Sequence, residues 1–334
     1  MGSNRISTMS INNKPLVSIN CLVYNHEPYL RDCFEGFVKQ RTTFPFEILV
    51  HDDASTDHSA DIIREYTAKY PNLFKPIYQK ENQYSKGIKI SYIYQYPRAQ
   101  GKYIALCEGD DYWTDPHKLQ MQVDFLESHP EYSMCFHAAI LKQENRILSF
   151  AEASFVEDKD YTADDVMANW IVPTASLVYK KQILNYPING ESRLVAGDIA
   201  TVMRCLAVGK IRGFSNKMSV YRISKQGVSS YRHRQKNVVL KYPDHILCLK
   251  ENFPFISQRI IDKCLAYRYW NRASFQPTFL LALQDRKRAF ISSPIVVFLA
   301  LLKPFATEVL LICSKFVNTQ KIMHNVRKVV MRKL

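Results

Sequence analysis

The first half of the chain alternates short apolar runs with segments whose apolar residues recur every three or four positions. Apolar runs bounded by polar turns are typical of buried strands, and the longer spacing is typical of helices that pack on one face. This pattern predicts strands at 15–24, 46–50, 73–78 and 103–107 and helices at 30–38, 59–70 and 118–129. Because strands and helices alternate with short connections, we predict an α/β fold with a right-handed, doubly wound parallel sheet.

The pattern continues less regularly towards residue 230. It predicts strands at 134–141, 174–179 and 217–223 and a helix that begins at Ile199. Residues 142–172 are rich in charge and follow neither period, so we predict a flexible insert there.

Charge divides the chain near Ser230. Residues 1–229 carry 26 Lys and Arg and 26 Asp and Glu, whereas residues 230–334 carry 19 Lys and Arg against 5 Asp and Glu. The net charge of +14 therefore lies in the last third, which favours an anionic partner such as lipid headgroups, nucleic acid or a charged substrate. We expect a disordered polar leader at 1–14, an α/β domain at 15–229 and a basic helical region at 230–334.

The cysteines and the leader both favour an intracellular protein. None of the eight cysteines shows the CxxC spacing, so we predict reduced thiols rather than a disulfide framework. The leader has no apolar segment of the kind found in signal peptides.

An acidic stretch follows the predicted strand at 103–107. Glu108, Asp110 and Asp111 fall within four positions and have no neighbouring Lys or Arg. Clustered carboxylates repel one another and lose hydration when they are buried. A divalent cation held by oxygen ligands resolves this and leaves coordination sites for phosphate oxygens. A metal–diphosphate site and an acidic surface turn are equally favoured by this stretch alone.

Polar residues also follow two other predicted strands. Tyr24 and Asn25 end the first strand, and Asp52 and Asp53 end the second. The carboxyl ends of parallel strands share one crevice, so these residues and the acidic stretch predict a nucleotide pocket. Neither the G-x-G-x-x-G fingerprint nor a G-x-x-x-x-G-K-[ST] loop is present in the sequence.

Five motifs together resemble the inverting family 2 glycosyltransferases of the GT-A fold. They are V-S-I-x-x-x-x-Y-N, V-x-D-D-x-S-x-D, G-K-Y-I-A-x-x-x-x-D-D, a later G-D at a helix start, and Tyr221-Arg222. The resemblance covers about residues 15–230 and is greatest to bacterial enzymes that build surface glycans. It implies a mostly parallel sheet flanked by helices, with a C-terminal helical extension. It also implies transfer from a nucleotide-sugar, most often a UDP-sugar, to a glycan or polyprenyl-linked acceptor.

The resemblance implies that the first two strand ends bind the nucleotide. Tyr24 would stack on the base, and Asp53 would accept a hydrogen bond from a base N–H group, with Asn25 and Asp52 beside them. The alternatives are a core tyrosine and an aspartate that caps the next helix, a role that we assign to Asp57.

For the acidic stretch, the resemblance implies contacts to ribose, diphosphate and metal. Glu108 and Asp110 would contact the nucleotide-sugar, and Asp110 and Asp111 would hold Mn²⁺ or Mg²⁺. Trp113 would pack on a sugar or belong to the core.

The resemblance implies that Asp198 is the catalytic base, which takes the proton of the attacking hydroxyl. The alternative role is the N-cap of the helix predicted to begin at Ile199. Many relatives have a metal-binding His where this chain has Ser224, and His233 is a weak substitute.

The basic region predicts contact with a membrane surface. Its apolar runs at 295–302 and 309–313 are too short to cross a bilayer, which takes about 20 residues. Residues 315–334 combine six Lys or Arg with apolar residues at helical spacing. We therefore expect residues 295–334 to bind an anionic membrane peripherally, at the cytoplasmic face, although a helical cap on the catalytic domain is the alternative.

Two other functions compete with sugar transfer. A nucleic-acid-binding protein would use the aromatic residues of the basic region to stack on bases, although no nucleic-acid motif is present and we expect no nucleic acid. These residues are Tyr242, Phe253, Phe255, Tyr267, Tyr269 and Trp270. A nucleotidyltransferase would need a glycine-rich phosphate loop after the first strand, which the sequence lacks.

Overall fold

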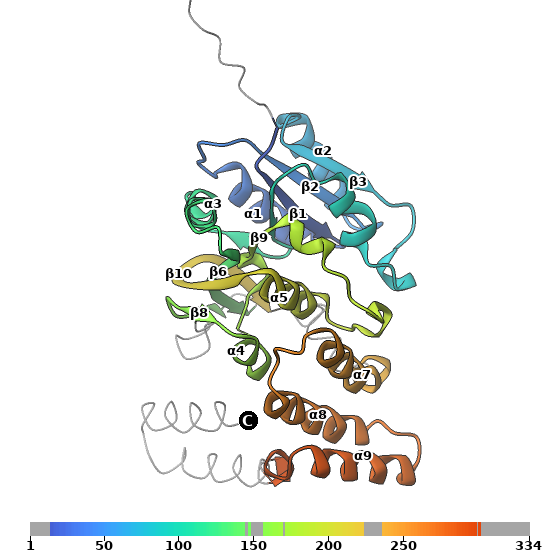
Figure 1. Cartoon of the computed structure of the whole chain (residues 1–334). Coiled ribbons are helices and arrows are strands. Elements are labelled where there is room, and N and C mark those ends of the chain that lie inside the picture. The colour runs from blue at the N-terminus through green and yellow to red at the C-terminus, as the bar shows by residue number, and fades with distance from the viewer. Residues whose placement is uncertain are drawn as a thin grey trace, which may run out of the picture.

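A single mixed sheet forms the centre of the molecule (Figure 1). The structure is a computed structural model, and it describes residues 14–143, 146–147, 156–169, 171–223, 236–298 and 300–301. The order of the main strands is β3-β2-β1-β4-β9-β6-β10-β5, with β7 paired to β6 and β8 paired to β10. The strands are β1 Val17–Val23, β2 Phe46–Asp52, β3 Phe74–Tyr78, β4 Tyr103–Leu106, β5 Tyr112–Trp113, β6 Tyr132–Gln143, β7 Arg146–Ile147, β8 Asp160–Tyr161, β9 Val178–Lys180 and β10 Lys210–Ile223.

The first half of the sheet agrees with the predicted parallel arrangement. Strand β1 pairs in parallel with β2 and β4, and β2 pairs in parallel with β3. The prediction of a mostly parallel sheet is confirmed, and the antiparallel strands include β9, which pairs antiparallel with both β4 and β6. The strand predicted at 174–179 begins late, because Thr174–Ser176 forms a 3₁₀ turn in which the Ser176 amide donates to the Pro173 carbonyl.

Helices cover both faces of the sheet, as Figure 1 shows. Alternate residues of β4 face opposite sides: Tyr103 and Ala105 belong to one apolar core, and Ile104 and Leu106 belong to the other. The helices are α1 Glu27–Val38, α2 Ser59–Lys69, α3 Lys118–Ser128, α4 Ala163–Ala168, α5 Gly197–Val208, α7 Lys236–Asn252, α8 Gln258–Ala273 and α9 Phe279–Ser292.

Two predictions about the middle of the chain need correction. The insert predicted at 142–172 contains β8 and the short helix α4, which begins with a capping box between Thr162 and Asp165. Its residues 144–145, 148–155 and 170 lie outside the described part. Strand β10 begins at Lys210 rather than at residue 217. Its charged first half shows little apolar pattern, but its backbone pairs with β6 and β8.

The C-terminal helices confirm the predicted helical extension. Ile246 and Leu249 of α7 and Ile261 of α8 share one core with Phe136 of β6. Helices α7 and α8 therefore pack on the same core as the sheet, and the division into 15–229 and 230–334 stays a prediction. No helix within the described ranges is long and apolar enough to cross a membrane.

Helix α3 begins with a buried lysine. Lys118 is fully buried, and its Nζ donates to Gln122 Oε1 at 2.7 Å. The same Nζ lies 4.1 Å from the centre of the Trp113 ring. Within the described part of the chain no carboxylate forms an ion pair with it. Burial lowers the pKa of Lys118 to about 7.

We expect Lys118 to make stability depend on pH. Its pKa is about 7 in the folded state and 10.5 ordinarily, so the unfolded chain binds more protons between these values. Stability should therefore rise with pH from 7 towards 9, by at most about 1.4 kcal/mol per pH unit. Urea unfolding at pH 7, 8 and 9 should show this slope for the wild type and a flatter one for Lys118→Met. Lys102→Met, which removes an exposed lysine paired with Glu127, is the control, and equal slopes in all three proteins would contradict the expectation.

Candidate active site

Three groups of predicted residues meet at the carboxyl edge of the sheet. The strand register places Val23 opposite Asp52 and Asn20 opposite Leu106. Just beyond the strands, the Asp53 amide donates to the Val23 carbonyl at 2.9 Å. The Gly109 amide donates to the Leu22 carbonyl at 3.0 Å. The ends of β1, β2 and β4 are thus held side by side, as the sequence predicts.

Tyr24 and Asn25 follow β1 and have different tasks. Tyr24 is 45% exposed, so it is not a core tyrosine and its ring is open to a ligand. Asn25 has a positive φ of 55°, which few residues other than glycine adopt. Its Oδ1 accepts the Thr56 amide at 2.7 Å, and its own amide donates to Ser55 Oγ at 2.9 Å. Asn25 therefore fastens the loop after β1 to the loop after β2.

The two aspartates at the end of β2 are both buried. Asp53 accepts the amides of Gln83 and Tyr84, one on each carboxylate oxygen, at 2.7 and 3.0 Å. These two hydrogen bonds hold the loop that contains Gln83 and Tyr84. Each carboxylate oxygen also has a second lone pair, which can accept a hydrogen bond from a base N–H group. Burial raises the pKa of Asp52, which accepts only a long 3.4 Å hydrogen bond from the Ser55 amide.

Asp57 binds the first amide of α2, although His58, between Asp57 and the helix, is the N-cap residue. Asp57 Oδ1 accepts the Ser59 amide at 2.9 Å, and its Oδ2 accepts the Glu27 amide at 3.0 Å. One carboxylate thus satisfies the first turns of α2 and α1 together. Hydrogen bonds from Ser59 and Glu27 lower the pKa of Asp57 despite its partial burial.

The acidic stretch forms a tight turn between β4 and β5. Glu108 is exposed, Asp110 is half-buried and Asp111 is buried. Gly109 permits the turn because a Cβ there would lie 2.8 Å from Nδ1 of His26 and 3.1 Å from side-chain carbons of Leu30 and Val23. His26 is a neighbour that the sequence analysis missed. Burial lowers its pKa, and the charge of Asp110 opposes that shift.

Asp111 is the buried carboxylate of this turn. Burial raises its pKa well above the usual range, and the neighbouring charge of Asp110 raises it further. The Arg222 amide donates to Asp111 Oδ1 at 2.7 Å, which partly offsets these effects. A buried carboxylate with so little compensation favours a positively charged ligand.

Arg222, near the end of β10, clamps the same turn. Its Nη1 donates to the Asp110 carbonyl at 2.7 Å, and its Nη2 pairs with Asp32 of α1. The guanidinium carbon lies 4.4 Å from the centre of the Tyr112 ring and 5.0 Å from that of Tyr29. Sequence motifs indicated only the Tyr221-Arg222 pair. The clamp could not be predicted because β10 follows the turn by about 110 residues.

Trp113 lies in the core rather than in the crevice. It is 3% exposed, its Nε1 donates to the Ala175 carbonyl at 2.8 Å, and its ring packs edge-on against Phe37. Of the two roles considered for Trp113, the structure supports the core role. Tyr112, its neighbour, is half-buried beneath Arg222.

Asp198 lies in the first turn of α5. The helix begins at Gly197, two residues earlier than predicted, and Ala196 is the N-cap residue. Oδ1 of Asp198 accepts the Ile199 amide at 2.9 Å, so the carboxylate also satisfies part of the helix end. A carboxylate in this position is stabilised by the helix dipole.

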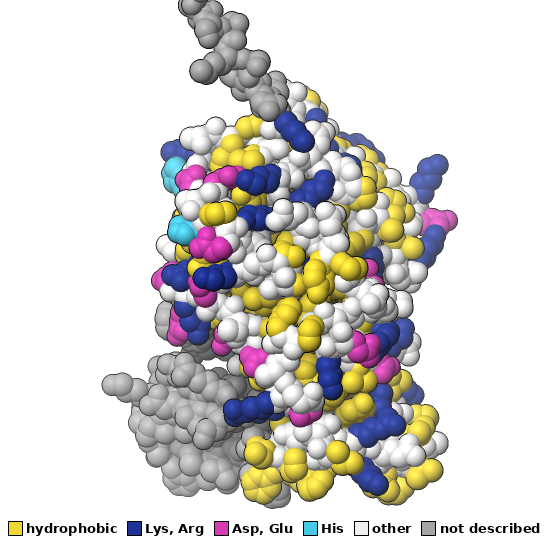
Figure 2. All heavy atoms as spheres, in the orientation of Figure 1, with side chains coloured by type: hydrophobic (Ala, Val, Ile, Leu, Met, Phe, Trp, Pro, Cys, Tyr) yellow, Lys and Arg dark blue, Asp and Glu magenta, His cyan; other side chains and the backbone are white. Residues whose placement is uncertain are grey.

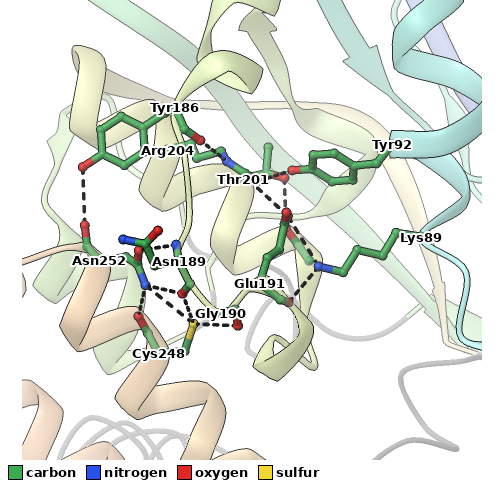
Figure 3. Close-up of polar contacts among 11 residues, drawn as sticks. Lys89, Tyr92, Tyr186, Asn189, Gly190, Glu191, Thr201, Arg204, Cys248 and Asn252 are labelled. Atoms are coloured by element: carbon green, nitrogen blue, oxygen red, sulfur yellow. Dashed lines mark hydrogen bonds and ion pairs between the residues drawn. The ribbon is translucent and has the colours of Figure 1, made fainter.

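A polar network holds α5 against its neighbours (Figure 3). Arg204 of α5 is 3% exposed. Its Nε donates to the Tyr186 carbonyl at 3.0 Å, its Nη2 to Glu191 Oε1 at 3.1 Å, and its Nη1 to the Tyr92 hydroxyl. Lys89 Nζ donates to the Glu191 carbonyl at 2.8 Å. The network therefore joins α5, the helix that carries Asp198, to residues 89–92, which follow the loop that Asp53 holds at Gln83 and Tyr84.

The described residues alone do not form a complete metal site. No group of three or more His, Cys, Asp or Glu side chains among them is arranged to hold a metal ion. Asp110 and Asp111 supply two carboxylates of one turn. Ser224 and His233, the positions considered for a third ligand, lie outside the described residues.

Comparison with known proteins identifies the family. Residues 18–179, which contain the candidate nucleotide-binding residues and both candidate metal-binding aspartates, match the family described as glycosyl transferase family 2. Residues 18–179 of the chain therefore form a glycosyl transferase family 2 domain. Asp198 and Arg222 follow the matched residues, so their roles depend on the geometry and on the resemblance.

Two relatives by sequence each match about two thirds of this chain. A Mycobacterium tuberculosis protein named only as uncharacterized is 37% identical over 222 residues, covering 66% of this chain and 63% of that protein. A Bacillus subtilis protein named for a glycosyltransferase role in teichuronic acid biosynthesis is 26% identical, covering 65% of this chain and 82% of that protein. The chain thus matches less than two thirds of the length of the mycobacterial relative.

Solved structures agree with the GT-A fold. Staphylococcus aureus TarS in complex with UDP-GlcNAc has a TM-score of 0.53 and 16% identity, covering 84% of this chain and 90% of that one. A mannosyltransferase from Pyrobaculum calidifontis in complex with GDP-Man and Mn²⁺ has a TM-score of 0.56 and 16% identity, covering 96% of this chain and 85% of that one. At these identities the likeness concerns the fold.

Proposed function

We propose that this protein is a metal-dependent, inverting glycosyltransferase that moves a sugar from a nucleotide-sugar to a hydroxyl group of a glycan or lipid-linked acceptor. The observation that carries the proposal is the meeting of Tyr24, Asp53 and Asp111 at one edge of a family 2 sheet. An exposed aromatic ring, a buried hydrogen-bond acceptor and a carboxylate turn suit a base, its N–H group and a diphosphate.

The protein would hold the donor at the ends of β1, β2 and β4. Tyr24 offers a ring face to the base, and Asp53 offers its free lone pairs to a base N–H group such as that of uracil or thymine. Structures with UDP-GlcNAc and GDP-Man have the same fold, and a UDP-sugar is the donor that we propose.

Asp110 and Asp111 would hold Mn²⁺ or Mg²⁺ together with the diphosphate. Two hard oxygen donors suit such a cation, which takes further ligands from phosphate and water. When bound, the cation acts as a Lewis acid on the leaving nucleoside diphosphate. Arg222 would keep the turn in shape through its contacts to both aspartates.

Asp198 would act as the general base. As the acceptor oxygen forms its bond to the anomeric carbon, the hydroxyl proton passes to the Asp198 carboxylate. The bond from the anomeric carbon to the diphosphate oxygen breaks on the opposite side, which inverts the configuration. The hydrogen bonds of Arg204 would keep α5, and therefore Asp198, in a fixed position during the reaction.

The acceptor and the place of action extend the proposal. The teichuronic acid name of the Bacillus subtilis relative supports a role in cell-surface polysaccharide synthesis. Each of the seven cysteines in the described part is free, which suits the reducing cytoplasmic side of a membrane. Of the range 295–334 predicted to bind an anionic membrane, only 295–298 and 300–301 are described.

The nucleic-acid alternative is weakened by two buried aromatic residues. Tyr242 and Phe253 pack in the interior and offer no face to a base. Phe255 and Tyr267 are partly exposed, but single exposed aromatic side chains are common on protein surfaces and do not by themselves indicate binding to bases.

A thermal-shift screen tests the proposed function. The melting temperature should rise when UDP-, GDP- or dTDP-sugars are added with Mn²⁺, because a ligand that binds only the folded state stabilises it. UDP-sugars should give the largest rise, and chelation of the metal should abolish it. Tyr24→Ala should weaken the rise, whereas Tyr84→Ala, which changes a similarly exposed tyrosine, should reduce it less. A chain that no nucleotide-sugar stabilises, with or without metal, would contradict the proposal.

A further inference from the structure

Helix α9 has its polar side facing the protein. Asp285, the only acidic residue between residues 279 and 301, is 1% exposed. Its two carboxylate oxygens accept Arg272 Nη2 at 2.6 Å and Nε at 2.9 Å, and Gln276 Nε2 donates to it at 2.6 Å. An ion pair and an amide thus fasten α9 to α8, where a surface helix normally packs its apolar face.

The apolar side chains of α9 and the following residues point away from the protein. Each of eight large apolar residues is more than half exposed, and they gather along the lower rim of the molecule in Figure 2. They are Phe279, Leu280, Leu283, Phe290, Ile291, Ile295, Phe298 and Leu301. Within α9 the first five follow one another at spacings of one, three, seven and one residues, which at 3.6 residues per turn places all of them within about one third of the helix circumference. Exposed apolar patches of this extent mark an interaction surface.

Lys287 lies within this apolar face, four residues after Leu283 and three before Phe290, and Arg286 and Arg288 lie on either side of it. Lys287 and Arg288 are exposed, although Arg288 Nη1 lies 3.8 Å from Asp285 Oδ1. Arg286 stacks on Trp270 with its guanidinium carbon 3.6 Å from the ring centre. With Asp285 buried and paired, the exposed charges of 279–301 are all positive. An apolar helix face with Arg beside it, and with a long Lys side chain that can extend to lipid phosphates, suits a helix that lies in the plane of an anionic membrane interface.

We propose that the face formed by α9 and residues 295–301 docks on an anionic lipid bilayer. Phe279, Leu283 and Phe290 would enter the acyl boundary, and Lys287 and Arg288 would reach the lipid phosphates. None of the helices in the described ranges can span a membrane, so the contact is parallel to the surface.

A second copy of the chain fits this face less well. A symmetric dimer brings the same patch of both subunits together, so the cations at 286–288 of one subunit would face those of the other. The face has no exposed carboxylate to pair with them. Lipid phosphates supply that missing negative charge.

This inference rests on the proposed function for its meaning, since it would place the enzyme beside a lipid-linked acceptor. Its physical content is binding to lipid, which is measured without donor, metal or transfer. The α9 face also adds residues 279–294 to the membrane contact expected at 295–334. Failure of sugar transfer would therefore not contradict lipid binding by α9, and failure of lipid binding would not contradict sugar transfer.

Co-sedimentation of the full chain with vesicles tests the inference. Vesicles of phosphatidylcholine with one quarter phosphatidylglycerol should bind the wild type, and pure phosphatidylcholine should bind it less. The variant Phe290→Ser/Ile291→Ser should lower the partition coefficient about tenfold or more, because two exposed apolar side chains no longer enter the bilayer. The variant Val208→Ser/Phe255→Ser changes two exposed apolar residues elsewhere and should bind like the wild type.

Two further measurements separate lipid from a protein occupant. Phe290→Trp should show blue-shifted fluorescence with anionic vesicles and quenching by brominated lipid, beyond the signal of the native tryptophans. Light scattering should give the same molar mass for the wild type and for Phe290→Ser/Ile291→Ser. A dimer that becomes a monomer in this variant, or a variant that loses thermal stability while vesicle binding is unchanged, would overturn the proposal in favour of a protein contact.

Discussion

Asp198→Asn should abolish sugar transfer while the protein still binds its donor. The amide cannot accept the proton of the attacking hydroxyl, and general-base catalysis contributes about 10²–10⁴-fold to a rate. The side chain keeps its shape and can still accept the Ile199 amide, so α5 should stay in place. The loss of a charge in the first helical turn costs only about 0.3–1 kcal/mol. We therefore expect a fall in kcat of at least about hundredfold with little change in donor affinity.

The measurement is release of nucleoside diphosphate from the nucleotide-sugar that stabilises the protein best. Water and a bacterial membrane lipid extract serve as acceptors, because a general base activates either one. Asp61→Asn removes an exposed aspartate from the first turn of α2 and is the matched control, which should react like the wild type. Wild-type turnover by Asp198→Asn would remove Asp198 from the catalytic role.

The sequence predicts the site best where its residues are close to one another along the chain. The ends of β1, β2 and β4 were predicted correctly, because apolar runs mark the strands and parallel strands end at one edge. Asp57 accepts the first amides of α1 and α2, as its place before α2 suggests, although the N-cap residue of α2 is His58. A helix start needs an acceptor at that position, and the polar residue before α2 supplies it.

Long-range contacts explain what the sequence did not predict. Arg222 reaches Asp110 and Asp111 only because β10 and β5 are neighbours in the sheet, and a strand of two residues such as β5 has no detectable period. The antiparallel β9 is similarly short, at three residues. His26 became visible as a neighbour of the acidic turn only through the packing around Gly109. Local patterns therefore predict which candidate site residues follow the strand ends. The neighbours of those residues, such as Arg222 and His26, become known only from the tertiary structure.

Asp111→Asn should abolish metal-dependent binding of nucleoside diphosphate. The substitution removes the negative charge of the buried ligand but keeps an oxygen that can accept the Arg222 amide. Outer partners of metal ligands already change metal affinity by about 10–100-fold, so loss of a direct ligand should cost about hundredfold or more. Isothermal titration of UDP in the presence of Mn²⁺ should show heat for the wild type and none for Asp111→Asn at the same concentrations. Undiminished binding would contradict the metal assignment.

Arg222→Lys tests the contacts of the Arg222 guanidinium separately from the proposed metal-binding carboxylates. Lysine keeps the positive charge and the backbone amide, but it cannot donate to the Asp110 carbonyl and Asp32 together or stack flat between Tyr29 and Tyr112. We therefore expect an intermediate loss of UDP affinity, about tenfold, with the metal requirement kept. Asp160→Asn, which changes a carboxylate on β8 that accepts the Tyr132 hydroxyl, should bind UDP like the wild type. If Arg222→Lys also binds like the wild type, the turn keeps its shape without the guanidinium, and the contacts of Arg222 serve only to join β10 to α1.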